Sequence, residues 1–80
     1  MQIGEATRAR ILEICRERGI TVNGLSTLCG ITQSTLNNIV SGRNKGVTVS
    51  TLQKICDGLE ISIVEFFASP LFSNIDQEIK

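Results

Sequence analysis

The 80-residue sequence contains no histidine, tryptophan or tyrosine, and its only aromatic residues are three phenylalanines. Without histidine, Ser–His and Cys–His dyads are excluded within this chain, and a zinc site lacks its usual nitrogen ligand. The eight acidic residues are scattered, and no glycine-rich phosphate loop or aromatic-lined pocket accompanies them. The sequence therefore predicts a non-enzymatic protein with no metal and no other cofactor.

Cysteine is also scarce, at three residues: Cys15, Cys29 and Cys56. An odd number at wide spacing is not a disulfide framework. Each cysteine lies among apolar residues at helical spacing, so we expect three buried, reduced thiols. A redox-sensing thiol would need exposure and a lowered pKa. Arg16 and Arg18 near Cys15 keep that alternative open.

Long apolar runs are absent, as is a basic segment followed by an apolar one, so the sequence predicts a cytoplasmic protein without a membrane segment. No small-molecule site is evident. The length allows one domain, and 41% hydrophobic with 20% charged residues is typical of a globular protein. A domain this small has a thin core, which an oligomer would help to stabilise.

Apolar residues recur at helical spacing along the whole chain, and no stretch favours a strand. The pattern predicts an all-α protein with helices over residues 5–18, 22–28, 33–41, 49–59 and 63–68. Four polar residues precede these helices as N-caps, the last with a glutamate three positions on as in a capping box: Thr21, Thr32, Thr48 and Ser62 with Glu65. Pro70 is expected to close the fifth helix.

Each helix is expected to bury one apolar stripe. Residues 11, 12, 14 and 15 form the first stripe, and Val22, Leu25 and Leu28 form the second. The fourth runs through Val49, Leu52, Ile55, Cys56 and Leu59.

The second and third helices are separated only by a short turn around Gly30. A short turn of this kind makes two helices meet at a steep angle. The small side chain of Ser26 allows close approach, and Leu25, Leu36 and Ile39 are expected to fill the corner. This is the geometry of a helix-turn-helix.

The segments ERGITVNGLSTLCGITQSTLNNIVSGR and TLQKICDGLEISIVEFF resemble the Cro/C1-type (XRE) helix-turn-helix family of phage repressors and bacterial regulators. The resemblance covers roughly residues 8–68 and is strongest at GITQSTL and at the LxKICDGLxIS block. It implies a compact five-helix, lambda-repressor-like DNA-binding domain over residues 1–69. The segment 70–80 is then a tail, with a possible docking or dimerising role.

The resemblance implies that the third helix enters the major groove of duplex DNA as a recognition helix. Its outer face carries neutral amides and hydroxyls rather than charges, and such groups can hydrogen-bond base edges. Residues near the start of a recognition helix usually read the bases. We therefore predict base contacts by four residues: Gln33, Ser34, Asn37 and Asn38.

Phosphate contacts are expected at the start of the second helix, where free N–H groups point at anions, and in the loop after the third. The candidates are Thr21, Asn23, Thr35, Arg43, Asn44 and Lys45. Thr35 is a candidate for a phosphate or a thymine methyl. The family often carries glutamine at the position of Val22, which has no side-chain donor.

The charge balance is the main objection to DNA binding, since the net charge is zero and the pI about 6.2. The charge is unevenly distributed along the sequence. Residues 1–54 carry seven basic and three acidic residues (+4), and residues 55–80 carry one basic and five acidic residues (−4). Zero net charge and Val22 favour the alternative of a helical protein-interaction module, antitoxin-like or structural, that has kept the fold without DNA binding.

Family members usually form dimers, which place two recognition helices one DNA turn apart on a palindromic site. A homodimer interface is predicted at the fifth helix and tail, from Phe66, Phe67, Leu71, Phe72 and Ile75. In the alternative reading, Phe66 or Phe67 belongs to the core and the tail is loose.

Overall fold

The computed structural model describes residues 1–43 and 46–79, and the regular secondary structure within them consists of helices. The elements are α1 (Ile3–Arg18), α2 (Val22–Cys29), α3 (Gln33–Val40), α4 (Val49–Leu59), α5 (Ile63–Phe67) and a short 3-10 helix, η1 (Pro70–Phe72). The predicted all-α fold with five α-helices is confirmed. No helix of these residues combines the length and apolarity needed to cross a membrane.

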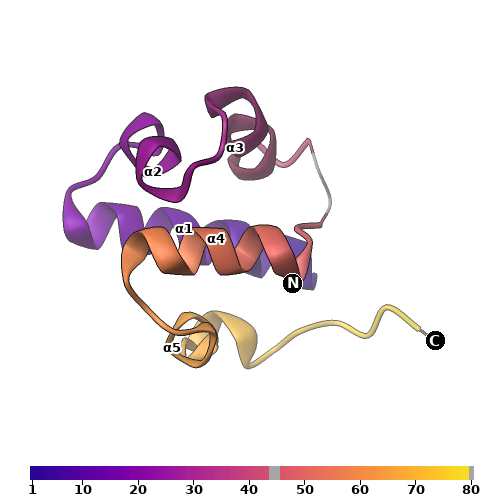
Figure 1. Cartoon of the computed structure of the whole chain (residues 1–80). Coiled ribbons are helices and arrows are strands. Elements are labelled where there is room, and N and C mark those ends of the chain that lie inside the picture. Colours follow the sequence, from indigo (N-terminus) through magenta and orange to yellow (C-terminus); the bar gives the residue numbers. More distant parts are fainter. Residues whose placement is uncertain (44–45, 80) are drawn as a thin grey trace.

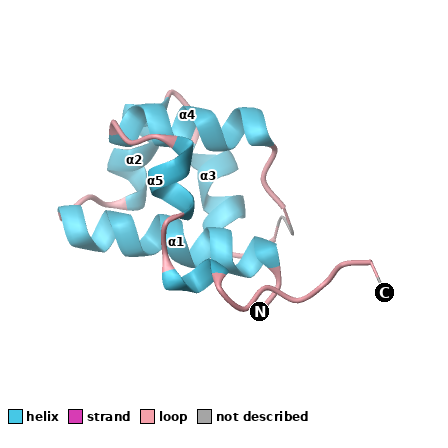
Figure 2. Cartoon of the chain, turned by 90° about the horizontal axis from the view of Figure 1, so that it is seen from below, coloured by secondary structure: helices cyan, strands magenta, loops and turns pink. Residues whose placement is uncertain are grey.

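The helices form three layers (Figure 1). α1 and α4 make up the middle layer, and Figure 2 shows that they lie at its opposite edges. The α2–α3 layer covers one side of this pair, where α2 packs on α4 and α3 packs on α1. On the other side, α5 packs on α4 and η1 packs on α1. Viewed from below, α5 lies in front of α2 and α3, so the α5–tail layer (residues 61–79) and the α2–α3 layer are on opposite sides of the domain (Figure 2).

Threonine begins three of the helices. The hydroxyl oxygens of Thr21, Thr32 and Thr48 accept backbone N–H bonds at 3.0, 3.2 and 3.1 Å. At α5, Ser62 and Glu65 exchange side-chain and backbone hydrogen bonds in a capping box. All four predicted caps are therefore confirmed. A side-chain cap of this kind typically stabilises a helix by about 1 kcal/mol.

Four helix ends differ from the sequence prediction by one or two residues. α2 ends one residue later, at Cys29, and α3 ends one residue earlier, at Val40. α1 begins at Ile3 rather than residue 5, because Gln2 acts as N-cap and its N–H donates to Glu5 Oε1 at 3.3 Å. α5 ends at Phe67, one residue early. Pro70 opens η1, where its missing N–H costs nothing in the first turn.

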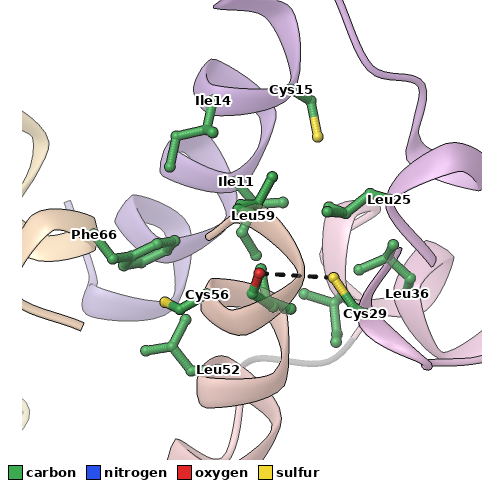
Figure 3. Packing of buried hydrophobic residues seen from close by; sticks show 12 residues of the cluster. Ile11, Ile14, Cys15, Leu25, Cys29, Leu36, Leu52, Cys56, Leu59 and Phe66 are labelled. Atoms are coloured by element: carbon green, nitrogen blue, oxygen red, sulfur yellow. Dashed lines mark hydrogen bonds between the residues drawn. The ribbon is translucent and has the colours of Figure 1, made fainter. Parts of the chain in front are cut away.

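The core lies between the three layers and draws on every α-helix (Figure 3). α2 and α4 approach closely at Gly58, where a Cβ would lie 2.7 Å from Cys29 Sγ and 2.9 Å from the Leu28 carbonyl. Only glycine fits there without a shift of backbone. The buried apolar side chains are Ala6, Ile11, Ile14, Cys15, Leu25, Cys29, Leu36, Ile39, Leu52, Ile55, Cys56, Leu59 and Phe66.

Three residues assigned to the apolar stripes are wrong as core positions. Leu28 is 54% exposed, because the inward face of α2 follows Leu25 and Cys29. Val49 is 78% exposed, because it opens α4 at the end of the helix beyond the core. Leu12 is exposed as well, since Ile11 takes the inward position on α1.

Arginines of α1 hold the C-terminal ends of two other helices. Arg10 Nε donates to the Phe66 carbonyl at 2.8 Å and Nη2 to the Glu65 carbonyl at 3.0 Å, while Nη1 pairs with Glu13 at 2.6 Å. Arg18 donates in the same way to the carbonyl of Leu59, the last residue of α4. Cations at helix C-termini complement the helix dipole, so these contacts fasten α5 and α4 to α1.

Candidate nucleic-acid interface

The corner between α2 and α3 is built as the sequence predicted. Gly30 adopts a left-handed conformation (φ 67°) and ends α2, and the next residue, Ile31, donates its N–H to the Ser26 carbonyl at 3.1 Å. Ser26 is buried, and its hydroxyl donates to the Asn23 carbonyl at 2.7 Å. Leu25 and Leu36 are both fully buried in the corner. This arrangement is a helix-turn-helix.

The outer face of α3 consists of neutral polar side chains. Leu36 and Ile39 point into the core, while Gln33, Ser34 and Asn37 are exposed. Asn38 is half-buried rather than fully exposed. Within the described part of the chain, these side-chain amides and the Ser34 hydroxyl make no hydrogen bond, so their donors and acceptors are available to an external partner. The four residues of α3 with such available groups are Gln33, Ser34, Asn37 and Asn38.

Threonine side chains at the start of α3 bond each other. The Thr32 hydroxyl donates to Thr35 Oγ1 at 2.9 Å, while its oxygen accepts the N–H of Thr35. The hydroxyl hydrogen of Thr35 is left to donate outward, which is the chemistry that a phosphate oxygen requires.

The start of α2 is the first phosphate candidate. The Thr21 oxygen accepts from the Gly24 N–H, and the side chain of Asn23 is exposed. The N–H groups of the first helical turn have no partner inside the helix and point outward. Val22 packs against the core. At this position a backbone amide is therefore the only hydrogen-bond donor.

The loop after α3 is the second phosphate candidate. Arg43 is exposed, and its backbone N–H donates to the Asn38 carbonyl at 3.1 Å. This bond holds the arginine at the end of α3. Asn44 and Lys45, which were predicted as phosphate contacts, lie outside the described residues.

The charges are segregated between the two outer layers. Residues 19–56 contain no aspartate or glutamate, and their only charges are those of Arg43, Lys45 and Lys54. Residues 61–79 contain Glu65, Asp76 and Glu78 and no cation. The charge asymmetry along the sequence therefore separates the α2–α3 layer from the α5–tail layer.

Two of the cations counted in the sequence are engaged inside the domain. Arg10 and Arg18 bond the ends of α5 and α4. Sequence reasoning missed these roles because the partners are backbone carbonyls 56 and 41 residues away. Both guanidinium groups therefore have hydrogen-bond partners within the domain.

The cysteine thiols are free and buried, as predicted. Burial raises the pKa of Cys29 to about 11, and the neighbouring Cys15 and Cys56 add to the increase. Burial likewise raises the pKa values of Cys15 and Cys56. A reactive thiol needs the opposite change, so this environment disfavours the thiol-sensor alternative. The described residues also contain no cluster of three potential metal ligands.

Comparison with known proteins identifies the fold. A family model of the Cro/C1-type HTH DNA-binding domain matches residues 10–69. The chain belongs to this family. The crystal structure of the prophage Lp1 protein 11 superposes with a TM-score of 0.79 and 34% sequence identity, covering 94% of this chain and all of the prophage protein. No curated protein sequence matches the chain.

Membership in the Cro/C1-type family makes this chain a DNA-binding domain of the kind that transcription regulators use. The α2–turn–α3 unit described above is therefore the helix-turn-helix of this family, and α3 corresponds to its second helix. The family match ends at residue 69. The tail of this Cro/C1-type chain is thus outside the matched region, although η1 packs on α1.

Proposed function

We propose that this protein is a non-enzymatic transcriptional regulator that binds duplex DNA in a sequence-specific manner. In this proposal α3 lies in the major groove, and two copies of the chain bind a palindromic site. The observation that carries the proposal is the outer face of α3. Its side-chain amides and the Ser34 hydroxyl form no hydrogen bond with other described residues, and the first turn of the helix carries no charge.

The side chains of α3 have the chemistry of base readers. An amide can donate and accept together, and so pairs with adenine N6 and N7, while a hydroxyl pairs with several base edges. Gln33 and Ser34, at the N-terminus of α3, occupy the positions that most often reach the bases, with Asn37 and Asn38 one turn further on. Each good bidentate contact discriminates against a wrong base by about 1–3 kcal/mol.

The phosphate contacts come from both ends of the helix-turn-helix. The N-terminus of α2 offers backbone amides together with Thr21 and Asn23, and Thr35 offers its free hydroxyl hydrogen. Arg43 supplies the cationic contact after α3, with Asn44 and Lys45 beside it in the sequence. Because residues 19–56 contain no aspartate or glutamate, the helix-turn-helix itself presents no negative side chain to a phosphate backbone.

We assign self-association to the α5–tail layer, with one residue changed from the sequence prediction: Val64 takes the place of Phe66. Phe66 is fully buried and packs edge-on against Phe67; as a core residue, it is not available to a partner. Phe67 and Val64 are exposed, at 38% and 78%. Together with the half-buried Leu71, Phe72 and Ile75, they form the apolar surface proposed for the homodimer.

The direct test is selection of bound sequences from a random duplex pool, using wild type and the double variant Gln33→Ala/Asn38→Ala. Wild type is expected to enrich one palindrome, and the variant is expected to lose or blur it. The control is Gln53→Ala, which removes an exposed amide from α4, outside both the predicted base-reading face and the α5–tail layer, and is expected to enrich the same palindrome.

A helical protein-interaction module is the second candidate, favoured by zero net charge and by the missing donor at Val22. It predicts no enrichment even at low salt, although the protein is folded. Enrichment that survives in Gln33→Ala/Asn38→Ala would keep DNA binding but remove α3 as its reader.

A further inference from the structure

Arg8 has a position that sets it apart from the other arginines of α1. A Cβ built on Gly42 would lie 3.2 Å from Arg8 Nη1 and 3.7 Å from Cζ. The guanidinium therefore lies against the backbone just after α3, next to Arg43. Gly42 has φ 84°, and its lack of a side chain leaves the space that Arg8 occupies.

The Arg8 guanidinium does not bond the end of another helix as those of Arg10 and Arg18 do. The ion pairs among the described residues join Arg10 to Glu13 and the N-terminal amine to Asp76. No hydrogen bond from Arg8 to another described residue is formed. Arg8 is half-buried, so its stem is supported by the protein while its donors stay open.

An open cleft of about 340 Å³ adjoins this guanidinium, between the start of α1 and the end of α3. Its walls carry one cation and one carboxylate: Arg8 and Glu5. Glu5 is engaged at the α1 N-terminus, where its Oε1 accepts the Gln2 N–H at 3.3 Å. The remaining wall residues are Gln2, Gly4, Ile39, Ser41 and Gly42.

We propose that Arg8 is a further phosphate-contacting residue, which extends the contact of Arg43 from the loop after α3 onto α1. This inference rests on the proposed DNA-binding function. Arginine donors suit phosphate oxygens, and two cations at one end of the recognition helix hold the same stretch of backbone. Glu5, in the same cleft, weakens this contact by repulsion.

The test is the salt dependence of binding to the selected duplex and to a scrambled duplex of equal length. Arg8→Gln is expected to lower affinity for both by roughly five- to tenfold near 0.1 M salt, and to reduce the slope of log affinity against log salt by about 0.9. Arg8→Lys keeps the charge and is expected to restore the slope. Glu5→Gln retains a capping acceptor and is expected to raise affinity about threefold.

Matched controls lie further along α1. Arg16→Gln and Glu17→Gln make the same charge changes on exposed residues, and Arg16 is about 12 Å along the helix from Arg8. Neither Arg16 nor Glu17 lines the cleft between the start of α1 and the end of α3. Both controls are expected to leave the salt slope unchanged.

The outcomes separate this inference from the proposed function. If wild type binds no duplex at low salt, both are overturned. If wild type binds and Arg8→Gln keeps its slope, only the role of Arg8 is overturned. A lower thermal midpoint with an unchanged slope would assign Arg8 to stabilising the C-terminus of α3 through the helix dipole.

Discussion

The two outer layers of the domain begin their helices with different chemistry. α2 and α3 start with threonine caps and carry no acidic residue in the first turn, and α4 follows the same pattern. α5, on the opposite side, starts with a serine–glutamate capping box. A glutamate in the first turn partly neutralises the positive end of the helix dipole, whereas a threonine leaves it in place.

This difference explains how a chain of zero net charge is compatible with DNA binding. Between residues 21 and 43 the only charged side chain is Arg43, whereas residues 61–79 carry three acids and no cation. The net charge is a sum over two faces with opposite character. The relevant quantity for a DNA-binding face is its local charge, because charges further than about 10 Å away are screened at ordinary salt.

The α2–α3 layer and the α5–tail layer are attached to the α1–α4 layer in different ways. The α2–α3 layer is attached by close packing at Gly58, and a substitution there is expected to have the largest effect on the free energy of unfolding. Gly58→Ala places a methyl group 2.7 Å from Cys29 Sγ and against the Leu28 backbone. Overpacking of this kind costs about 1–3 kcal/mol. Chemical denaturation is expected to show a loss of unfolding free energy near the upper end of this range, because the backbone at Leu28 must move.

The control for this prediction is Gly46→Ala. A Cβ at Gly46 meets no atom within 4 Å, so its unfolding free energy is expected to stay within about 0.5 kcal/mol of wild type. Equal stability of Gly58→Ala and Gly46→Ala would contradict close packing as the attachment of α2 to α4.

The α5–tail layer is attached through polar contacts, which Arg10→Gln removes. Two backbone carbonyls and Glu13 lose a charged partner. Hydrogen bonds to charged groups contribute about 1.5–3 kcal/mol, so a loss of about 2 kcal/mol in unfolding free energy is expected. Hydrogen exchange is expected to quicken in α5 before it does in α3. Arg16→Gln, an exposed change on the same helix, serves as control, and faster exchange in α3 alone would count against this attachment.

Val64 and Val49 provide a matched pair of substitutions, Val64 to test self-association and Val49 to test DNA binding. Both are 78% exposed, and both lie in the first turn of a helix, where aspartate is tolerated. Val64→Asp is expected to weaken self-association roughly tenfold in sedimentation, because it puts a charge into an apolar contact. Val49→Asp is expected to leave self-association unchanged and to lower DNA affinity by about 1 kcal/mol. Weaker DNA binding in Val64→Asp and weaker self-association in Val49→Asp would reverse the assignment of the two faces.

Alkaline pH is expected to act on the α2–α3 layer first. Because the folded-state pKa of Cys29 is raised to about 11, the neutral thiol stabilises the fold fully below pH 9. This contribution is lost as pH rises from 9 towards 11, since the unfolded thiol releases its proton more readily. Thermal midpoints recorded against pH for wild type and Cys29→Ala measure the effect, and parallel curves would be inconsistent with it.

Much of the helix-turn-helix follows from local sequence signals. Thr21, Thr32 and Thr48 mark helix starts because a side-chain cap is a contact within a few residues. The corner of Leu25, Leu36 and Ile39 follows from helical periodicity and one short turn. The neutral face of α3 was visible for the same reason, and its base-reading role stays a prediction.

The remaining features depend on contacts that sequence spacing does not reveal. Leu28 was expected in the core and is exposed, whereas Cys29 is buried as predicted, because Gly58 on another helix makes room for its sulfur. The roles of Arg10 and Arg18 depend on carbonyls of distant helices. The place of Arg8 depends on the fold bringing α1 against the end of α3. Tertiary packing decides each of these positions.

The central claim is that the α2–α3 layer, and not the α5–tail layer, faces DNA. Its most direct test is an NMR titration of nitrogen-labelled protein with a duplex carrying a single half-site, so that dimer contacts do not contribute. The account predicts the largest amide shift changes at residues 21–23, 33–38 and 43, with residues 61–79 unchanged. Changes confined to α5 and the tail, with α3 unaffected, would contradict it.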